Sequence, residues 1–484
     1  MTESGTSIPQ PFHQTAAAPD RDRLLLISYH FPPGQATGAL RWQRLSTFAA
    51  ARGWALDVIT LDPAHLGSTD PTRLAELPAG VRIFGVPPAG PPVVDRLLEG
   101  GWRLYRGFRE RRERSRTTSP GRAAPASGPR QVKRDGIRRH ELRWLPRSPR
   151  DLIRAYNAWL EFAHEGRWAR RAAALAARLA GGATPIRAVI ACGPPHMTHE
   201  AGRLASIRLG VPFIMDMRDP WSTVPRLHEP LASPLWYALA EYHERCAVAR
   251  STLVVTNTMP AMRALRERYP ESAERVITVM NGFDDEPLPP PAPETRFLMA
   301  YAGAIYTNRD PRLLFRAAAR VIRELGLAPA DFGLEFMGHV AVLHDTPLEE
   351  LARAEGISEY VRLHPPAPRR AALEFLARAA VLISLPQDVE TAIPSKVFDY
   401  MRFHAWLLAL VERDTATELV LRGTGADVVA PNDLDGLTSL IRERYLQFRA
   451  GYRPPPIAER AEQLSRRAQA EIFFGALERA LAGG

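Results

Sequence analysis

The residue types best suited to chemistry gather in one short stretch in the second half of the chain. Pro394 and Ser395 predict the start of a helix directly after the apolar run 380–385, which is typical of a buried strand. Unpaired N–H groups in a first helical turn attract phosphate, and Lys396 adds a positive charge beside them. Asp399 follows one turn later, where a carboxylate can accept two hydrogen bonds from a ribose diol. The spacing would fit a sugar nucleotide, but taken alone the same pattern is more often only a helix cap and a surface pair.

The start of the chain has the same order of strand, loop and helix. Leu24–Ser28 predicts a strand, and a helix is expected from Gly38 to about Arg52. Gly34 and Gly38 allow a ligand to approach the backbone closely at the carboxyl end of that strand. Their spacing is not Gly-x-Gly-x-x-Gly, so the dinucleotide-binding fingerprint is not met.

Strand and helix patterns alternate over most of the chain, which predicts an α/β protein with doubly wound parallel sheets. A Pro-rich segment divides the alternation into two units. We therefore predict two Rossmann-like domains that face each other across a cleft, with a last helix that crosses back onto the first domain. The predicted division is a disordered tail at 1–20, a first domain at 21–286, a linker at 287–296, a second domain at 297–454 and a C-terminal helix at 455–484.

The net charge of +10 is concentrated in one segment. Residues 103–150 hold sixteen Lys or Arg and four Asp or Glu, whereas the rest of the chain holds 47 basic and 49 acidic residues. A near-neutral body argues against nucleic acid as a partner. The segment is rich in Arg, Ser, Pro and Gly, so we predict a mobile insertion, with aromatic side chains and arginines that favour an anionic membrane surface. A solvated loop without a partner is the alternative.

The compartment is predicted from the cysteines and from the apolar runs. Cys192 and Cys246 cannot form a disulfide framework and lack metal-ligand spacing. No apolar run reaches 18 residues, and Met1–Asp20 has no signal-peptide pattern. We expect a cytoplasmic protein, peripheral at the inner face of the membrane if the insertion binds lipid.

Six motifs together resemble the family-4 glycosyltransferases of the GT-B type, the branch that builds bacterial polysaccharides and other glycans. The resemblance covers nearly the whole chain apart from the tail and the basic insertion. Its motifs are Ser28-Tyr-His-Phe-Pro-Pro-Gly34 with Gly38 and Arg41, Gly193-Pro-Pro-His196 with His199, Asp216-Met-Arg-Asp-Pro-Trp221, Asn281-Gly-Phe283, Tyr301-Ala-Gly-Ala-Ile-Tyr306 with Arg309, and Pro394-Ser-Lys-Val-Phe-Asp399.

The resemblance implies a nucleotide-sugar donor, UDP- or GDP-linked, that is bound mostly by the second domain. Arg309 and Lys396 would neutralise the departing diphosphate, and Asp399 would hold the ribose. The implied donor-binding residues are Gly34, Gly38, Gly303, Arg309, Glu390, Ser395, Lys396 and Asp399. No cofactor and no metal ion is expected, because helix ends and basic side chains can position the diphosphate.

The resemblance places a glycan or lipid-linked acceptor in the first domain. Its contacts would come from Arg41, His196, Arg218 and Asp219, although Arg218 and Asp219 could instead pair with each other. The implied catalytic residues are His196, Arg309 and Lys396, and the implied transfer retains the anomeric configuration.

The chain departs from the family pattern at three places. Glu390 and Asp399 are separated by eight residues where the family often has seven, so Thr391 stands at the matching position. The Ala-Gly that commonly follows is replaced by 403–406, and a second basic residue beside Arg309 is missing or supplied by Arg312. Two alternatives stay open: a sugar-nucleotide epimerase of the same architecture, and a non-catalytic relative that binds glycan or scaffolds an assembly.

Overall fold

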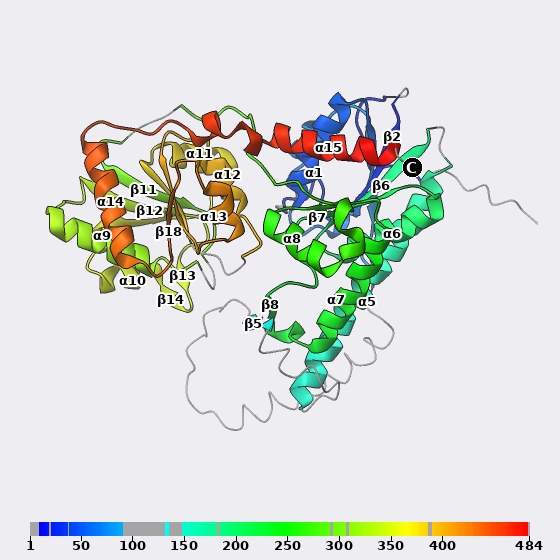
Figure 1. Ribbon diagram of the computed structural model, residues 1–484, viewed down its shortest axis with the longest axis horizontal. Helices are drawn as coiled ribbons and strands as arrows, with labels where there is room; N and C mark the ends of the chain where they lie inside the picture. The colour runs from blue at the N-terminus through cyan, green and yellow to red at the C-terminus, as the bar shows by residue number, and fades with distance from the viewer. Residues whose placement is uncertain are drawn as a thin grey trace, which may run out of the picture.

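The computed structural model describes residues 9–18, 21–36, 38–90, 131–134, 148–181, 184–290, 294–305, 309–385 and 390–482. Figure 1 shows two lobes side by side, each with a twisted sheet at its centre. Most of the predicted basic insertion at 103–150, and residues 291–293 of the predicted linker, lie outside the described residues.

The first lobe is built on a sheet in which the described residues form eight strands, in the order β1-β4-β3-β2-β6-β7-β9-β10. All neighbouring strands are parallel except the edge pair β1 and β4. The strands are β1 (His13–Gln14), β2 (Arg23–Ser28), β3 (Ala55–Leu61), β4 (Val81–Val86), β6 (Ile186–Gly193), β7 (Phe213–Met217), β9 (Leu253–Thr256) and β10 (Val276–Thr278).

The second lobe has a sheet of six strands among the described residues, all parallel, in the order β15-β12-β11-β16-β17-β18. This is the doubly wound Rossmann order, and ligands bind where such an order reverses, at the carboxyl ends of the strands. Its strands are β11 (Phe297–Ala302), β12 (Phe332–Met337), β15 (Val361–His364), β16 (Val381–Ser384), β17 (Trp406–Leu410) and β18 (Asp427–Val429). The predicted fold class, two Rossmann-like domains, is confirmed.

Helices cover both faces of each sheet (Figure 1). Those before the second sheet are α1 (Gly38–Ala51), α2 (Thr72–Ala75), α5 (Pro149–Leu179), α6 (Met197–Leu209), α7 (Pro234–Arg250) and α8 (Met259–Arg268). The others are α9 (Arg312–Leu325), α10 (Leu348–Ala354), α11 (Arg369–Ala377), α12 (Ser395–Tyr400), α13 (Ala416–Leu421), α14 (Leu434–Arg449) and α15 (Arg466–Ala482). None of these described helices combines the length and the apolar character that crossing a bilayer requires. Two short pairs, β5 (Gln131–Lys133) with β8 (Arg226–His228) and β13 (Val342–Leu343) with β14 (Thr346–Pro347), lie outside the main sheets.

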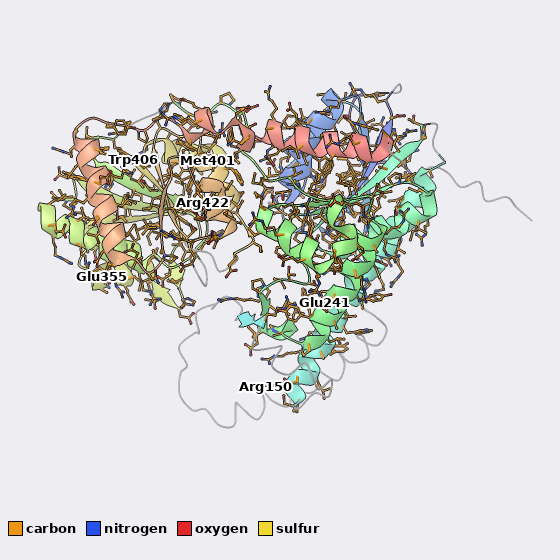
Figure 2. All side chains as sticks on the ribbon, viewed as in Figure 1. Arg150, Glu241, Glu355, Met401, Trp406 and Arg422 are labelled. Carbon is orange, nitrogen blue, oxygen red and sulfur yellow. The ribbon has the colours of Figure 1, made fainter. Side chains whose placement is uncertain are left out.

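Each central strand is buried on both faces, because its side chains alternate between two apolar layers. Leu24 and Leu26 of β2 belong to one layer, whereas Leu25 and Ile27 belong to the other. The second lobe is packed in the same way, and Figure 2 shows its side chains filling the space around the sheet, with Met401 and Trp406 labelled.

Helix α15 joins the end of the chain to the first lobe. Phe473 is fully buried, belongs to the same apolar layer as Leu24, and meets Trp42 of α1 edge-on, with ring centroids 5.4 Å apart. Figure 1 shows this helix, in red, lying across the first lobe beside α1 after the chain has left α14 in the second lobe.

Two sequence predictions of local structure are wrong. The predicted disordered tail at 1–20 contains β1, where His13 pairs with Ile83 and extends the edge of the sheet. The C-terminal helix was predicted at 455–484, but α15 begins at Arg466, because the Ser465 hydroxyl accepts a hydrogen bond from the N–H of Ala468 and caps the helix there.

Candidate active site

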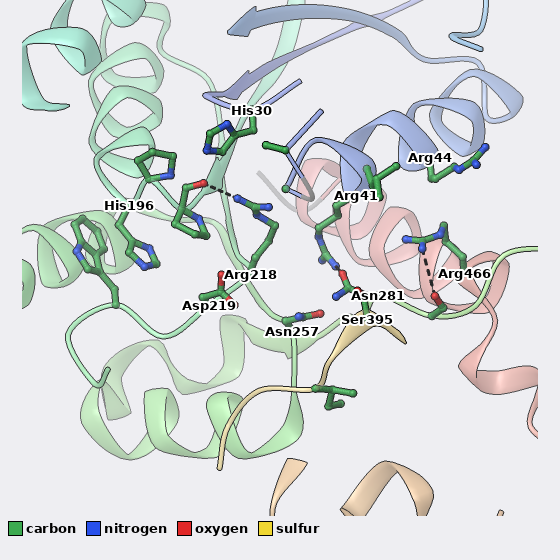
Figure 3. Close-up of a pocket in the computed structure, with 18 of the residues that line it drawn as sticks. His30, Arg41, Arg44, His196, Arg218, Asp219, Asn257, Asn281, Ser395 and Arg466 are labelled. Carbon is green, nitrogen blue, oxygen red and sulfur yellow. Dashed lines mark hydrogen bonds between the residues drawn. The ribbon is translucent and has the colours of Figure 1, made fainter. Parts of the chain in front are cut away.

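A cavity of about 650 Å³ lies between the carboxyl ends of the first sheet's strands and helices α11 and α12 of the second lobe. This is the edge at which a doubly wound sheet binds its ligands. Many of the residues on the first lobe's side lie in the loops that follow strands β2, β6, β7, β9 and β10, and Figure 3 shows several of them pointing into the cavity. They include His30, Pro194, His196, Arg218, Asp219, Asn257 and Asn281, and the second lobe adds Arg369, Ile393, Ser395 and Asp399.

His196 reaches the cavity from the loop between β6 and α6. Its ring stacks on Trp221, with centroids 5.2 Å apart and planes 13° from parallel. Burial, His199 and Arg218 hold the pKa of His196 well below its usual value, so the imidazole is neutral at physiological pH. Its Nδ1 is buried and has no hydrogen-bond partner within the described part of the chain.

Arg41 forms a buried ion pair below the cavity floor. Its Nε and Nη2 donate to both carboxylate oxygens of Asp216 at 2.9–3.2 Å, and Trp42 Nε1 donates to the same carboxylate at 2.8 Å. Burial alone would raise the pKa of Asp216, but the Arg41 guanidinium lowers it below its usual value. Arg41 also donates to the Val279 carbonyl at 3.1 Å, so its guanidinium is engaged by the protein even though it lines the cavity.

Arg218 is fixed by main-chain carbonyls. It donates to the carbonyl of Gly193 at 3.0 Å and to that of Pro194. A Cβ atom added at Gly38 would lie 2.0 Å from Arg218 Nη1, so the absence of a side chain at Gly38 makes room for the guanidinium. Asp219 follows at the cavity surface, where burial raises the pKa of its carboxyl group. Figure 3 shows Arg218 and Asp219 between His196 and Arg41.

Lys396 points away from solvent, toward the end of β11. Its Nζ donates to the Ala302 carbonyl at 2.7 Å and lies 3.7 Å from the centroid of the Tyr301 ring. Burial, and then the charge of Arg309, lowers the pKa of Lys396 to about 6. Arg309 in turn donates to the Ala304 carbonyl at 3.0 Å. Lys396 and Arg309 are thus two basic side chains close enough for the charge of one to lower the pKa of the other, and an anion bound beside them would offset that repulsion.

Gly303 is required by this arrangement. Its φ of 139° is rarely open to other residues, and an added Cβ would lie 2.5 Å from Lys396 Nζ. We call Gly303, Arg309 and Lys396 the basic cluster. It does not line the cavity itself, but Ser395, which precedes Lys396 at the start of α12, does.

Asp399 lies on α12 and faces the cavity. Its carboxylate accepts hydrogen bonds from Arg369 at 3.2 and 3.4 Å, so a ribose diol would have to share or replace this partner. The lobes meet beside it, where the Thr258 hydroxyl donates to the Thr391 carbonyl at 2.6 Å.

Besides the basic cluster, two further predicted donor-binding residues, Gly34 and Glu390, do not line the cavity. Gly34 closes a turn in which its N–H donates to the Phe31 carbonyl at 3.0 Å. Glu390 is exposed, and its carbonyl accepts from the N–H of Ala416 at 2.7 Å.

Sequence reasoning missed one side of the cavity. Glu161, Phe162 and Glu165 of α5 and Trp236 of α7 line it. The spacing of Glu161 and Glu165 places both on one face of a helix, but nothing in the sequence shows which face meets the cavity. Among the described residues, no three side chains of His, Cys, Asp or Glu come together in a group that could hold a metal ion.

Comparison with known proteins agrees with this geometry. No protein-family model matches the chain. A stretch of 161 residues, 31% of this chain, is 31% identical to D-inositol 3-phosphate glycosyltransferase 1 of Catenulispora acidiphila and covers 38% of that relative. Over 208 residues, 40% of this chain, the sequence is 27% identical to D-inositol 3-phosphate glycosyltransferase of Thermobispora bispora, and the match covers 48% of that relative. The chain thus matches less than half the length of these curated relatives.

Solved structures match over nearly the whole chain. HepE of Anabaena in complex with UDP-glucose superposes with a TM-score of 0.54 at 10% identity, covering 95% of this chain and all of that one. Sucrose-phosphate synthase from Thermosynechococcus elongatus gives 0.55 at 13% identity, covering 96% of this chain and all of that one. These structures share the fold, which is GT-B, and the resemblance to glycosyltransferases predicted from the motifs is confirmed.

Proposed function

Because the chain has the GT-B fold and resembles glycosyltransferases in sequence, we propose that it transfers a sugar from a nucleotide-sugar donor to an acceptor hydroxyl. The observation that carries this proposal is the position of the basic cluster. It lies at the end of β11, beside the point where the second sheet reverses its order, and next to a cavity large enough for a nucleotide sugar. We place the transfer in bacterial polysaccharide or glycan biosynthesis.

The basic cluster would receive the donor diphosphate. Gly303 lets the backbone approach the phosphates, and Arg309 and Lys396 supply positive charge where negative charge develops as the glycosidic bond breaks. An arriving dianion raises the pKa of the buried amine, so Lys396 takes up a proton and becomes a full cation. No metal ion has a step in this proposal.

Asp399 would bind the ribose after exchanging its bond to Arg369. Ser395, one turn earlier on α12, would contact the phosphates or the donor sugar from the cavity wall.

The acceptor would enter from the first lobe, beside His196, Arg218 and Asp219. The depressed pKa of His196 makes this residue a weak base. The leaving phosphate oxygen is therefore the better group to take the acceptor proton, on the same face of the sugar, which gives retention of the anomeric configuration.

The test is a direct assay of donor consumption. The wild type is incubated with UDP- and GDP-linked hexoses and a panel of acceptors, and the anomeric configuration of the product is read by NMR. Arg309→Ala should lower turnover at least a hundredfold, because one transition-state cation is worth about 3 kcal/mol. Arg353→Ala, an exposed arginine on α10, is the matched control and should leave turnover unchanged. Turnover that Arg309→Ala does not affect would overturn the assignment of the basic cluster.

We also propose that the protein binds the membrane surface at the free end of α5. Leu152, Ile153 and Trp159 of that helix are 58%, 39% and 41% exposed, which is unusual for apolar side chains so close together. They lie next to the basic segment 103–150, whose charge would be attracted by anionic lipid.

Flotation with vesicles of anionic lipid tests the membrane proposal. The wild type should float, and the double variant Leu152→Ser/Trp159→Ser should float less. Equal flotation of the two proteins would refute a role for α5, and no flotation of the wild type would refute membrane binding.

A further inference from the structure

One end of the cavity is acidic and aromatic, unlike the rest of its wall. Glu161 and Glu165 lie one turn apart on α5, and both face the cavity. We call them the acidic pair. Phe162 and Trp236 stand beside them edge to face, with ring centroids 5.8 Å apart. Such a wall differs from the arginine-rich side of the cavity, where Arg44, Arg369 and Arg466 lie.

Within the described part of the chain, neither carboxylate of the acidic pair takes part in an ion pair. Trp236 Nε1 donates to Glu161 at 3.1 Å, and the backbone of Met197 lies close enough to Glu165 to lower its pKa in part. Burial and then the neighbouring Glu161 raise the pKa of Glu165 to about 8, and burial also raises the pKa of Glu161. Two carboxyl groups are thus held close together without the cation that would normally accompany them.

His196 adds an independent observation at the same end. The backbone of Met197 acts on the pKa of Glu165, so the Glu165 carboxyl group lies near the start of α6, where His196 precedes Met197. The His196 ring is enclosed and lines the cavity, yet its Nδ1 has no partner within the described residues. A neutral imidazole does not repel a cation, and its free nitrogen can accept a hydrogen bond.

We propose that this end of the cavity binds a protonated amine on the acceptor, as in an amino sugar or an aminocyclitol. An ammonium group has three N–H donors and no acceptor, which matches two carboxylates and an unpartnered imidazole nitrogen. The rings of Phe162 and Trp236 can contact the apolar face of a sugar or the cation itself. A neutral polyol could form the hydrogen bonds but would leave the buried carboxyl groups without a countercharge.

The proposal rests on the proposed function only in calling the ligand an acceptor, since binding needs no donor. Other titratable or charged groups around the pair are Tyr29, whose pKa Glu165 raises, His228, which faces Glu161, and Arg218, which faces His196. Of these, Arg218 is held by main-chain carbonyls. At pH 7, Glu165 is mostly protonated, so binding of an ammonium group should release close to one proton.

Calorimetry without donor tests the proposal. The probes are glucosamine and 6-amino-6-deoxyglucose, each compared with its N-acetylated form and with glucose. We expect at least tenfold tighter binding of an amine than of its N-acetylated form. We also expect proton release at pH 7, read from titrations in two buffers of different ionisation enthalpy.

Variants assign the binding to the acidic pair. Glu165→Gln and Glu161→Gln should each reduce the preference for the amine at least tenfold, and Glu165→Gln should abolish the proton release. Glu471→Gln, an exposed residue of α15, is the matched control. If Glu165→Gln does not fold, Glu161→Gln carries the same test.

Two results would overturn the inference: equal binding of the amine, acetamide and parent sugars, or a preference for the amine that survives both substitutions. Failure of the proposed function gives a different result, because amine binding would then be seen without consumption of any nucleotide sugar.

Discussion

Replacing Lys396 by methionine should stabilise the protein while destroying its anion site. The Lys396 pKa falls from 10.5 to about 6 in the folded protein. At pH 7.5 the unfolded chain therefore carries a proton on Lys396 that the folded protein does not. This pH lies three units below the ordinary lysine pKa of 10.5. At 1.36 kcal/mol per unit, this costs about 4 kcal/mol of folding free energy. Methionine removes that cost, but it also loses the hydrogen bond to the Ala302 carbonyl, which is worth about 1 kcal/mol. The net gain in folding free energy at pH 7.5 is therefore about 3 kcal/mol.

The sign of the pH dependence distinguishes this effect from simple repacking. Because the unfolded state binds more protons between pH 6 and pH 10.5, the stability of the wild type rises with pH in this window. The advantage of Lys396→Met should thus fall from about 3 kcal/mol at pH 7.5 to about 1 kcal/mol at pH 9. Urea unfolding of both proteins at pH 7.5 and pH 9 measures this difference in the free energy of unfolding.

A direct check is available because the chain has only two lysines, Lys133 and Lys396. NMR of the isotopically methylated amines should show one that titrates near pH 6 and moves upward when a nucleotide diphosphate is added. The reasoning is refuted if Lys396→Met is less stable than the wild type at both pH values, or if its advantage does not change with pH.

Two further substitutions test the first lobe. Gly38→Ala should displace the Arg218 guanidinium, since the new Cβ would lie 2.0 Å from Nη1, and should lower turnover more than tenfold with little loss of stability. The control is Gly67→Ala, whose Cβ would meet nothing within 4 Å, and equal turnover of the two variants would contradict the assigned packing. Arg41→Met should cost about 3–5 kcal/mol in urea unfolding, because it leaves the Asp216 carboxylate buried without its partner, and a loss below 1 kcal/mol would show that the pair is not structural.

Much of the fold could be predicted because the central strands of both sheets are mostly apolar runs. The strands predicted at Leu24–Ser28 and at 380–385 are found at Arg23–Ser28 and Val381–Ser384, and both are buried along their whole length. Helix α8, in contrast, was not predicted. It is short and Leu265 is its buried residue, so it lacks a wide apolar face. Its main signal is the Thr258 hydroxyl, which accepts a hydrogen bond from the N–H of Ala261.

The candidate site could be predicted only where a motif follows a strand. His196, Arg218 and Ser395 all stand within a loop or at a helix start next to a strand end, and all three line the cavity. Glu390 was predicted from the spacing of acidic residues in the family motif. In the structure it is exposed, and its backbone carbonyl accepts a hydrogen bond from the N–H of Ala416. Glu165 lies in the middle of a long helix, where only the packing of α5 against α6 decides which face meets the cavity.

The measurement that tests the central claim most directly is calorimetric titration of UDP and GDP, and of their glucose and mannose conjugates, into the wild type, Lys396→Met and Arg309→Ala at pH 7.5. We predict that one diphosphate binds the wild type with uptake of close to one proton, and that each variant binds at least tenfold more weakly, Lys396→Met without proton uptake. Binding of equal strength to all three proteins, or no binding of any nucleotide to the wild type, would contradict the account.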